Sequence, residues 1–540
     1  MLAKTQQNFR QTIDLNGIWD FKLDEDNEGV DGLWMESKLY AARPMPVPAS
    51  YNDITANLDI HQNTEPVWYQ RSFIAPKLGQ NTKAFLVFES VSHTAHVYIN
   101  DKEVGSHEGA ESSFEFDVTN ALKEGTSQLL SVRVSGKASD SKLYDYKGID
   151  GKVSLEIRPS NYIKEIKFIT KGITPLATGG VDFAQCEYEV ITSEEQVALV
   201  KIVLKNFKGD KVFESDKLTD SFKLDRPTLW SLDMPYLYTF CVEFGDDYYE
   251  QQLGIRSSII LENQLLLNSN PVKLHGFNYI KDYPLSGRSV SDTQLAHDIE
   301  LMIWMGANCI TSTTSKLPEE LLNWADKNGI LAIEGISNFD TEALKAQISI
   351  KQNHPSLVAW MIHACEDTKD KLDERIDLIR ELDPAHRPIF VKCGASKTKD
   401  FVEYGDVLVL DMCCSNKEAS DVASFISNYI AKFNEISKDH TKPLLAFNFA
   451  PEAPAASRSY FEDIYSEDFQ VSALAQLGYN FDANEYIIGE VLGSLADYKL
   501  AAKGQKSPIK TSGVFTRDRD AKTSAYTLRV RWHMLDGKEF

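Results

Sequence analysis

The first third of the chain alternates apolar and polar residues over short segments. Clear examples are AFLVFESV (84–91), AHVYINDKEVG (95–105) and LLSVRVSG (129–136), with turn-forming residues such as Asn100 and Asp101 between the apolar positions. A period of two places successive side chains on opposite faces of a strand, and short strands separated by turns are typical of sandwiches. The pattern predicts an all-β sandwich over residues 1–170.

A second β-rich block follows over residues 171–262. It contains the strand-like segments EYEVITS (187–193), VALVKIVLKNF (197–207) and YLYTFCVEFG (236–245). A block of about 90 residues with this pattern has the size of one immunoglobulin-like sandwich. We therefore expect a second, separate β-sandwich.

The rhythm changes over residues 263–540, where strand-like and helix-like segments alternate. The strand NPVKLHGFNY is followed by the helix SDTQLAHDIELMIWMG, and similar pairs continue through SLVAWMIHAC, DVLVLDMC and PLLAFNFA. About eight such units predict a (β/α)₈ TIM barrel. Active sites of these barrels lie at the C-terminal ends of the strands, so the candidate chemistry should be found there.

The length and charge of the chain narrow the range of functions. A chain of 540 residues is expected to form more than one domain. Its formal net charge of −22 argues against nucleic acid or an anionic membrane as a partner, because both would repel it. The same charge means that a site for an anionic ligand would need its own local cations.

Cysteine usage and the terminal segment indicate the compartment. Seven cysteines without a framework of spacings indicate free thiols, and the N-terminal segment lacks the apolar run of a signal peptide. No apolar stretch is long enough for a transmembrane helix. We expect a cytoplasmic protein that has no cofactor and no metal, since the adjacent Cys413 and Cys414 lack the C-x₂-C spacing of zinc sites.

Sequence motifs along nearly the whole chain are similar to those of one enzyme family. Their order and spacing resemble the family 2 glycoside hydrolases, and within them the β-glucuronidases. The resemblance implies a jelly-roll-like sandwich, an immunoglobulin-like sandwich and a TIM barrel. It also implies a retaining mechanism, in which two carboxyl groups about 5 Å apart act as acid and nucleophile. The matching segments include LNGIWDF (15–21), VWYQRSF (67–73), HEGAESSFEFDV (107–118), NHPSLVAW (353–360), LDPAHRP (382–388) and SGVFTRDRDAKTSAYTLRVRW (512–532).

Both catalytic carboxylates of the family are replaced in this alignment. The family has its acid in an Asn-Glu-Pro motif after the fourth strand, where this chain reads Ala364-Cys365-Glu366, so Cys365 takes the position of the acid. The nucleophile belongs to a Ser-Glu-Tyr-Gly motif after a Lys-Pro-led strand, and Asn448 takes its place. A neutral amide cannot form the glycosyl ester, so the resemblance predicts a pseudo-glycosidase without meaningful retaining activity.

Other pocket positions of the family also differ. The Arg of its Arg-Thr-Ser-His-Tyr-Pro run corresponds to Thr311, and the Asn of its Asn-Arg-Tyr-Tyr run corresponds to Asp411, followed by Met412 and Cys413. The Trp-Asn pair after the last strand reads Gly493-Ser494, and the uronate-binding Asn-Lys-Lys reads Lys510-Thr511-Ser512. The scaffold motifs are thus present while the pocket is rewritten.

Several residues at strand ends are candidates for new chemistry. His363 is two residues before Cys365 on the same strand face and could activate a thiolate. The favoured interpretation is instead that His363 points into the packed barrel and that Cys365 is a small apolar filler. Asp411 and Glu334 could act as acid, base or hydrogen-bond acceptor, and Glu334 could equally be structural. The charged run containing Arg517, Asp518 and Arg519 is expected to form an ion network beneath the barrel.

Three functions from different classes are compatible with these residues. The barrel mouth could serve a different small-molecule reaction or bind a ligand, with Cys365, Asp411, Asn448 and Thr311 lining it. The chain could instead be a structural or interaction protein. A residual O-glycosyl hydrolase would need Glu366 and Glu452, which are the only plausible pair of carboxylates. In each case a homo-oligomer is expected from the family.

Overall fold

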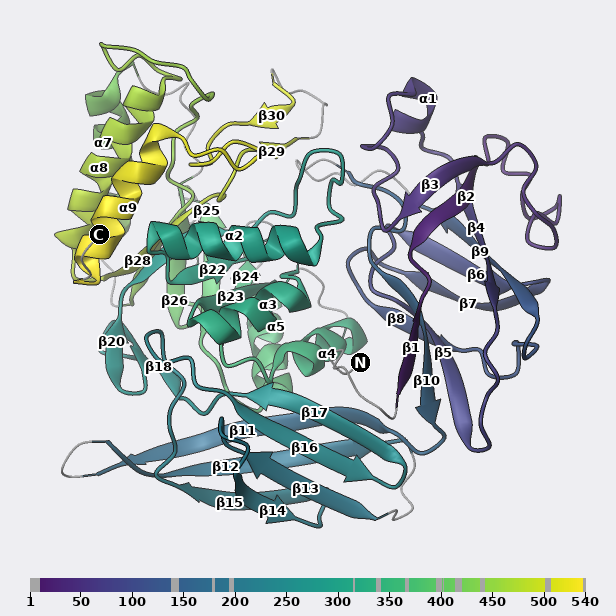
Figure 1. The fold of residues 1–540 in the computed structure, drawn as a ribbon. Coiled ribbons are helices and arrows are strands. Elements are labelled where there is room, and N and C mark those ends of the chain that lie inside the picture. The colour runs from purple at the N-terminus through teal and green to yellow at the C-terminus, as the bar shows by residue number, and fades with distance from the viewer. Residues whose placement is uncertain are drawn as a thin grey trace.

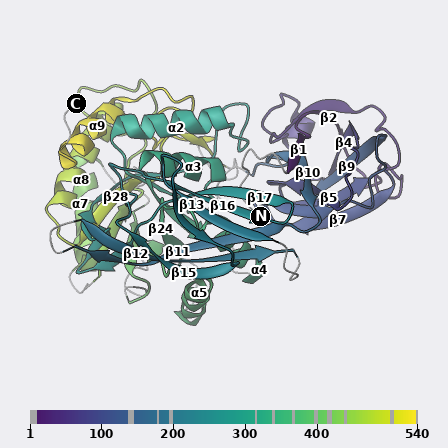
Figure 2. The ribbon, with the colours of Figure 1, turned by 60° about the horizontal axis from the view of Figure 1, so that its bottom comes forward.

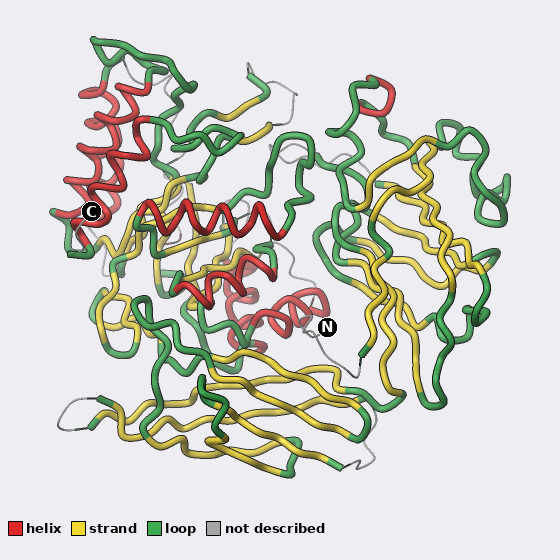
Figure 3. Tube along the Cα trace, in the orientation of Figure 1, coloured by secondary structure: helices red, strands yellow, loops and turns green. Residues whose placement is uncertain are grey.

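The computed structural model describes residues 10–136, 145–176, 180–193, 199–313, 316–336, 341–364, 369–394, 401, 403–412, 420–437, 442–500 and 507–537. These residues form two β-sandwiches and a closed barrel. Figure 1 shows the second sandwich under the barrel and the first sandwich beside it, and Figure 3 shows that the helices gather around the barrel.

The first sandwich consists of a four-stranded and a six-stranded antiparallel sheet. Their facing sides bury Trp19, Phe21, Leu86 and Phe88 in one core, so the predicted jelly-roll-like domain is confirmed. One short helix, α1 (Leu58–His61), lies between β3 and β4. The first sheet has the order β1 (Gln11–Asp14), β10 (Val153–Pro159), β5 (Thr82–Phe88), β8 (Phe114–Asp117). The second has the order β3 (Arg43–Val47), β2 (Gly17–Leu23), β4 (Val67–Ile74), β9 (Ser127–Ser135), β6 (Thr94–Ile99), β7 (Lys102–Glu108).

The second sandwich packs a three-stranded sheet on a four-stranded one around Phe168, Tyr188 and Phe240. The predicted boundary at residue 170 falls within its first strand. The three-stranded sheet has the order β11 (Ile163–Pro175), β12 (Val181–Thr192), β15 (Thr219–Asp225). The four-stranded sheet has the order β14 (Lys211–Ser215), β13 (Val200–Lys205), β16 (Tyr238–Phe244), β17 (Asp247–Leu253).

Eight parallel strands close the barrel in sequence order, as the alternating pattern predicts. Their residues are buried on both faces because helices cover the outside and side chains fill the inside. Gly276 is required where β21 meets β22, since a Cβ there would lie 1.8 Å from the carbonyl oxygen of Cys309. The strands are β21 (Leu274–Asn278), β22 (Cys309–Thr311), β23 (Leu331–Ile336), β24 (Leu357–His363), β25 (Ile389–Gly394), β26 (Val407–Asp411), β27 (Leu444–Phe447) and β28 (Ile487–Leu492).

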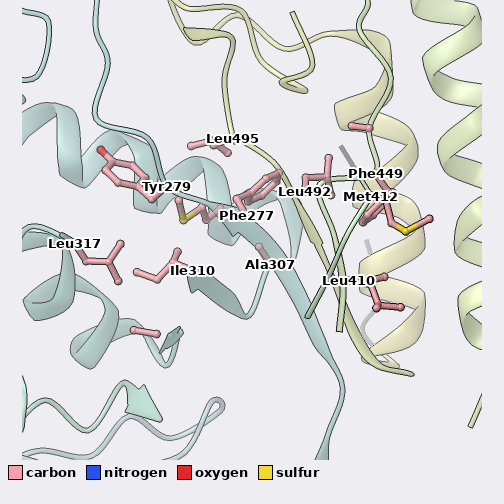
Figure 4. Close-up of a cluster of buried hydrophobic side chains, with 14 of the residues drawn as sticks. Phe277, Tyr279, Ala307, Ile310, Leu317, Leu410, Met412, Phe449, Leu492 and Leu495 are labelled. Atoms are coloured by element: carbon pink, nitrogen blue, oxygen red, sulfur yellow. The ribbon is translucent and has the colours of Figure 1, made fainter. Parts of the chain in front are cut away.

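Helices pack on the outside of the barrel through a large apolar cluster that includes Phe277, Ile310 and Leu492 (Figure 4). The first of them, α2, begins with a capping box between Ser291 and Gln294 and ends at Gly306, whose φ of 76° suits glycine. The helices are α2 (Asp292–Met305), α3 (Glu319–Asn328), α4 (Thr341–Lys351), α5 (Lys369–Leu382), α7 (Val422–Ser437), α8 (Glu467–Asp482) and α9 (Thr523–Leu535).

Two small sheets complete the barrel domain. Leu265 and Leu267, on one of them, pack with Trp230 against the apolar residues inside the barrel. The other is a two-stranded sheet that follows the last barrel strand. The first consists of β18 (Ser258–Leu261), β19 (Gln264–Leu267) and β20 (Asn270–Val272), and the second of β29 (Tyr498–Lys499) and β30 (Ile509–Lys510).

Ion pairs join the first sandwich to the barrel, and Figure 2 shows the two parts side by side. Arg517 donates to Asp282 at 2.9 Å and pairs with Asp53 of the first sandwich at 3.3 Å, while Arg519 pairs with Asp298 at 2.9 Å. The expected ion network therefore forms, although Asp518 is exposed. Its predicted place beneath the barrel is wrong, because Asp282 follows the C-terminal end of β21.

Candidate functional site

Strands β25, β26 and β27 bring three polar side chains together at the barrel mouth, the C-terminal ends of the eight strands. Lys392 on β25 forms an ion pair with Asp411 at the end of β26, with Nζ 2.7 Å from Oδ2. The other carboxylate oxygen of Asp411 accepts a hydrogen bond from Nδ2 of Asn448 at 3.0 Å. The amide of Asn448, which the motif resemblance aligns with the family's nucleophile, is thus bound to a carboxylate that already has a cation beside it.

The backbone at Asn448 supports this arrangement. Its φ of 55° is left-handed, a conformation that asparagine tolerates better than most residues. A Cβ added to Gly493, just after β28, would lie 2.0 Å from Oδ1 of Asn448. The side chain of Asn448 therefore occupies space that any larger residue at position 493 would need.

The polar contacts continue across the neighbouring strands β28, β21 and β22. Asn278 donates from Nδ2 to the carbonyl oxygen of Gly493 at 3.2 Å, and Thr311 donates from Oγ1 to Oδ1 of Asn278 at 3.4 Å. Thr311 is fully buried and is the register partner of Asn278 on the neighbouring strand, so its hydroxyl stays beside that amide. We call this set of six residues, Thr311, Asn278, Gly493, Asn448, Asp411 and Lys392, the mouth network.

The fourth strand ends at His363, whose side chain is exposed. The interpretation that His363 points into the packed barrel is therefore wrong. The candidate residues Cys365, Glu366 and Cys413 lie outside the described residues. The structure consequently brings together Asp411 and Asn448 of the predicted pocket residues, while Thr311 contacts Asn278 instead.

Glu334 on β23 is fully buried and serves the fold. Its carboxylate pairs with Lys351 at 3.1 Å and accepts from Gln347 at 2.9 Å and from the backbone N–H of Leu317 at 3.2 Å. The ammonium of Lys351 also donates to the carbonyl oxygen of Leu317. These contacts place Glu334 between β23, α4 and the segment before α3, which is the structural alternative predicted for it.

Glu452, the other carboxylate of the residual-hydrolase hypothesis, forms an ion pair with Lys510. Close by, Asp497 pairs with the buried Lys522 at 2.7 Å. Burial raises the pKa of Asp497 to about 6, against the opposing effect of Lys522. Both acids thus have cations of the C-terminal segment as partners.

Lys392 is a residue of the candidate site that sequence reasoning missed. It stands in IFVKCGA, an otherwise apolar strand segment, and its side chain is only 7% exposed. A lysine at the end of a buried barrel strand requires a carboxylate partner. The presence of a lysine in this apolar segment was therefore the sequence signal that could have predicted an ion pair in the site. Its ammonium also lies 5.3 Å from the centre of the Phe447 ring.

A cavity of about 350 Å³ lies in the first sandwich, in a different domain from the barrel mouth. Its lining includes Lys22, Asp24, Trp34 and Arg43. The ammonium of Lys22 covers the Trp34 ring at 3.7 Å, and Asp24 accepts from Trp68 at 2.9 Å. The polar groups of this cavity are thus partly engaged with one another.

Within the described ranges, no three His, Cys, Asp or Glu side chains are grouped so that they could hold a metal ion. The four described cysteines, Cys186, Cys241, Cys309 and Cys393, are buried thiols. Burial raises the pKa of the Cys309 thiol well above its ordinary value. Among the described helices, none is long and apolar enough to cross a membrane.

The two sandwiches and the closed barrel have the three-domain architecture of the family 2 glycosyl hydrolases. Family models match in chain order. The sugar binding domain of glycosyl hydrolases family 2 matches residues 12–159, and the family's second model matches residues 97–256. The TIM barrel domain matches residues 259–338 and 337–536, which is more than half of the chain. The chain belongs to glycosyl hydrolase family 2.

Proteins similar to this chain include β-glucuronidases, and the similarity extends over nearly the whole length of both proteins. The chain is 25% identical to that of Paenibacillus borealis, over 97% of both proteins, and 26% identical to that of Sus scrofa, over 99% of this chain and 92% of the other. The solved β-glucuronidase of an uncultured Clostridium species superposes with a TM-score of 0.89 at 28% identity, over 99% of this chain and 100% of that one. The Lactobacillus rhamnosus enzyme, at 24% identity and a TM-score of 0.90, has the same fold.

Proposed function

We propose that this β-glucuronidase-like protein has no retaining glycosidase activity and that its barrel mouth binds a small molecule or serves another reaction. The observation that carries the proposal is the hydrogen bond from Asn448 to Asp411 at 3.0 Å, with Lys392 beside the same carboxylate. Asn448 stands where the family's nucleophile is expected. Its amide nitrogen is directed at a neighbouring carboxylate.

The chemistry of these groups opposes glycoside cleavage. An amide has no carboxylate oxygen with which to form the covalent glycosyl intermediate. Asp411 cannot simply substitute for it, because one of its oxygens pairs with Lys392 and the other accepts from Asn448. Both groups are held by their neighbours rather than directed at a substrate. Loss of proton donation at Cys365 would by itself forfeit about 10²–10⁴-fold in rate.

The residual-hydrolase alternative rests on Glu366 and Glu452. Glu452 is paired with Lys510, and the two side chains are 27% and 20% exposed. A nucleophile with an adjacent ammonium is a weaker electron donor toward the anomeric carbon than a free carboxylate. This alternative is therefore less favoured than the loss of hydrolysis.

An assay with chromogenic β-glucuronide and β-galactoside substrates tests the proposal. We expect no turnover above the uncatalysed rate, and no difference between the wild-type protein and the variants Glu366→Gln and Glu452→Gln. A measurable rate that either variant abolishes would contradict the proposal. The exposed Glu374→Gln variant is the matched control for effects of charge removal alone.

A structural or interaction role has its own supporting observation. Tyr460 and Phe461, in the segment before α8, are 95% and 83% exposed, which is unusual for adjacent aromatic residues. We propose that they contribute to a homo-oligomer interface. Light scattering coupled to size-exclusion chromatography should give a mass above the monomer's 60.8 kDa, which the double substitution of Tyr460 and Phe461 by serine lowers. A monomeric wild-type protein would exclude this role for the two residues.

A further inference from the structure

A long loop of the first sandwich forms one wall of the cavity of about 350 Å³ in that domain. Residues 24–42 connect β2 to β3 without a helix or strand of their own. The cavity is lined by this loop together with residues of β2, β3 and α1. Loops longer than about 12–15 residues without secondary structure are usually either functional or disordered. The hydrogen bonds of this loop show that it has a fixed shape.

The middle of the loop is fastened by Gln70 of β4, which is fully buried. Its Nε2 donates to the carbonyl oxygens of Trp34 at 2.8 Å and Ser37 at 3.0 Å. Its Oε1 accepts the backbone N–H of Leu39 at 2.8 Å. One side chain of the sheet thus satisfies three backbone groups of the loop and fixes the position of Trp34 at the cavity.

The beginning of the loop is fastened by Asp24, which is only 1% exposed. Its carboxylate accepts the backbone N–H of Gly29 at 3.0 Å and Nε1 of Trp68 at 2.9 Å. A Cβ on Gly29 would lie 2.2 Å from Nε1 of Trp68, so the backbone at this point packs directly on the buried indole. The wall of the cavity is therefore formed before any ligand binds, which lowers the entropic cost of binding.

The lining of the cavity carries charges of both signs that do not neutralise one another. Lys22 and Arg43 supply cations, and the loop supplies the carboxylates of Glu25, Asp26 and Glu28. In the part of the chain that the structure describes, none of these five side chains forms an ion pair or a hydrogen bond. Their donors and acceptors are therefore available to a ligand in the cavity.

Trp34 holds the ammonium of Lys22 at the cavity wall. The ammonium lies 3.7 Å from the centre of the indole ring. An aromatic ring attracts a cation through its face, so the N–H donors of the ammonium are not used by an acceptor atom. Trp34 is half-buried, and within the described ranges its own Nε1 has no hydrogen-bond partner. The wall thus offers two kinds of N–H donor beside the carboxylates of the loop.

The mixture of charges indicates an uncharged ligand with many hydroxyl groups. Carboxylates would repel an anion, and the two cations would repel a cationic ligand. Among the described residues the acidic side chains are not grouped so that they could hold a metal ion. A hydroxyl group both donates and accepts, so a polyhydroxylated ligand can satisfy the carboxylates and the cations together. The volume is at the lower end of the range of about 300–1,000 Å³ for ligand pockets, which suits a small ligand.

We propose that this cavity binds an uncharged sugar unit, in a site separate from the barrel mouth. We call Lys22, Glu28, Trp34 and Arg43 the loop site. Its N–H groups donate to hydroxyl oxygens of the sugar, and the carboxylate of Glu28 accepts from a hydroxyl group. The site excludes uronic acids because their carboxylate would face the acidic loop. It does not depend on the proposed function, since the barrel mouth belongs to another domain.

Ligand-observed NMR titration of the full chain tests the site with the methyl glycosides of glucose, galactose, mannose and xylose. Glucuronate, glucosamine and glycine betaine are the anionic, cationic and zwitterionic comparators. We expect saturable binding of at least one neutral glycoside, and at least tenfold weaker binding of every charged comparator. No saturable binding of any neutral glycoside, or tighter binding of a charged comparator, would overturn the proposal.

The disaccharide that ends in the bound sugar distinguishes two sources of the ligand. Binding at least as tight as that of the methyl glycoside supports the site and identifies the end of a glycan chain as its ligand. Weaker binding of the disaccharide also supports the site, and identifies a free monosaccharide.

Variants of two exposed lining residues localise the binding. Glu28→Ala and Arg43→Ala should each weaken it about tenfold, and the double variant should abolish it. Both side chains are exposed, so the variants are expected to fold. Lys102→Ala and Glu124→Ala, which remove exposed charges elsewhere in the same sandwich, are the matched controls. Unchanged binding in the double variant, or equal loss in the controls, would overturn the proposal.

Tryptophan fluorescence gives an independent readout of the same site. The bound sugar should change the emission of the wild-type protein, because Trp34 lies at the cavity wall. The change should be lost in Trp34→Phe and retained in Trp324→Phe, which removes a 37% exposed indole of α3 in the barrel domain. An equal change in Trp34→Phe and wild type would place the sugar elsewhere and overturn the proposal. Turnover of a glucuronide would contradict the proposed function without affecting these results.

Discussion

The two ends of the barrel use polar side chains differently. One end includes the segment before β24, and the other end is the barrel mouth. Before the strand, Asn353 accepts the backbone N–H of Phe168 at 3.0 Å and donates to the carbonyl oxygen of Ile166 at 2.6 Å, which ties the barrel to the second sandwich. The next residue, His354, lies between Asp326 at 2.6 Å and Glu319 at 2.9 Å. Every one of these contacts serves the fold.

A second network supports the same end of the barrel. Asp383, after α5, accepts from Nε1 of the buried Trp360 at 2.9 Å and pairs with Arg387 at 2.6 Å. Arg387 also donates to the carbonyl oxygen of Leu357 at 2.9 Å. These residues belong to the segments NHPSLVAW and LDPAHRP, in which the resemblance to the family is clear.

At the barrel mouth the resemblance is weak, and the polar residues form a different network. Lys392, Asp411 and Asn448 contact one another, and none of their contacts described above reaches a sandwich domain. The comparison teaches that the residues that assemble the three domains are separate from those that would act on a substrate. The mouth could therefore change without loss of the fold.

The largest effect is expected at Asp383. Asp383→Ala removes the carboxylate from a buried arginine and a buried indole, so the free energy of unfolding should fall by about 3–5 kcal/mol. Urea unfolding followed by tryptophan fluorescence measures it. The exposed Asp377→Asn variant, on helix α5 just before Asp383, should change the free energy of unfolding by less than about 0.5 kcal/mol. Equal losses of stability in the two variants would mean that the network around Asp383 does not hold this end of the barrel together.

His354→Gln should cost about 2–3 kcal/mol at pH 7, since the buried Asp326 and the half-buried Glu319 lose a charged donor. Burial alone would lower the pKa of His354, but Asp326 and Glu319 outweigh it and raise the pKa to about 10. The stabilisation is complete below the ordinary value of 6.5 and is lost as the pH rises toward 10. The difference between wild type and variant should therefore shrink from pH 6.5 to pH 10. A difference that grows over this range would show that His354 is neutral in the folded state.

A smaller effect is expected from the mouth network. Asp411→Asn leaves the ammonium of Lys392 without its carboxylate and should destabilise the protein by about 1–2 kcal/mol. Adding Lys392→Met should recover most of that loss, because the uncompensated charge is then gone. A double-mutant cycle by thermal unfolding measures the coupling between the two residues. Additive losses would mean that the two side chains act independently.

The smallest effect is expected at Glu452. Its ion pair with Lys510 is partly exposed to solvent, so Glu452→Gln should change stability by no more than about 0.5 kcal/mol. Chemical denaturation at low and high salt checks this, and any difference should shrink at high salt. A loss above about 2 kcal/mol would mean that this end of the barrel also holds essential structural pairs.

Much of the fold followed from the sequence because its signals are local. The strand and helix periods are visible within ten or fifteen residues, and the closed order of eight strands follows from their alternation. The domain boundary was less clear, since β11 (Ile163–Pro175) has the same alternating pattern as the strands before it. Periodicity does not indicate which sheet a strand joins.

The candidate site was predicted only in part because its contacts are distant in sequence. Asn448 and Asp411 were identified from their motif positions, but their hydrogen bond depends on the pairing of β26 with β27. Lys392 had no motif to identify it. Likewise, Glu111 of the first sandwich accepts the backbone N–H of Lys316 of the barrel, and only domain packing brings these two residues together.

The side chain of Asn448 also limits which residues its neighbours can be. Asn448→Glu alone would place a new carboxylate against Asp411, and like charges at hydrogen-bond distance are unfavourable. A tryptophan at position 493 would in turn collide with the side chain at 448, because a single Cβ there already lies 2.0 Å from Oδ1. Positions 411, 448 and 493 are therefore coupled by charge and by packing, so that a change at one of them limits what the other two can be.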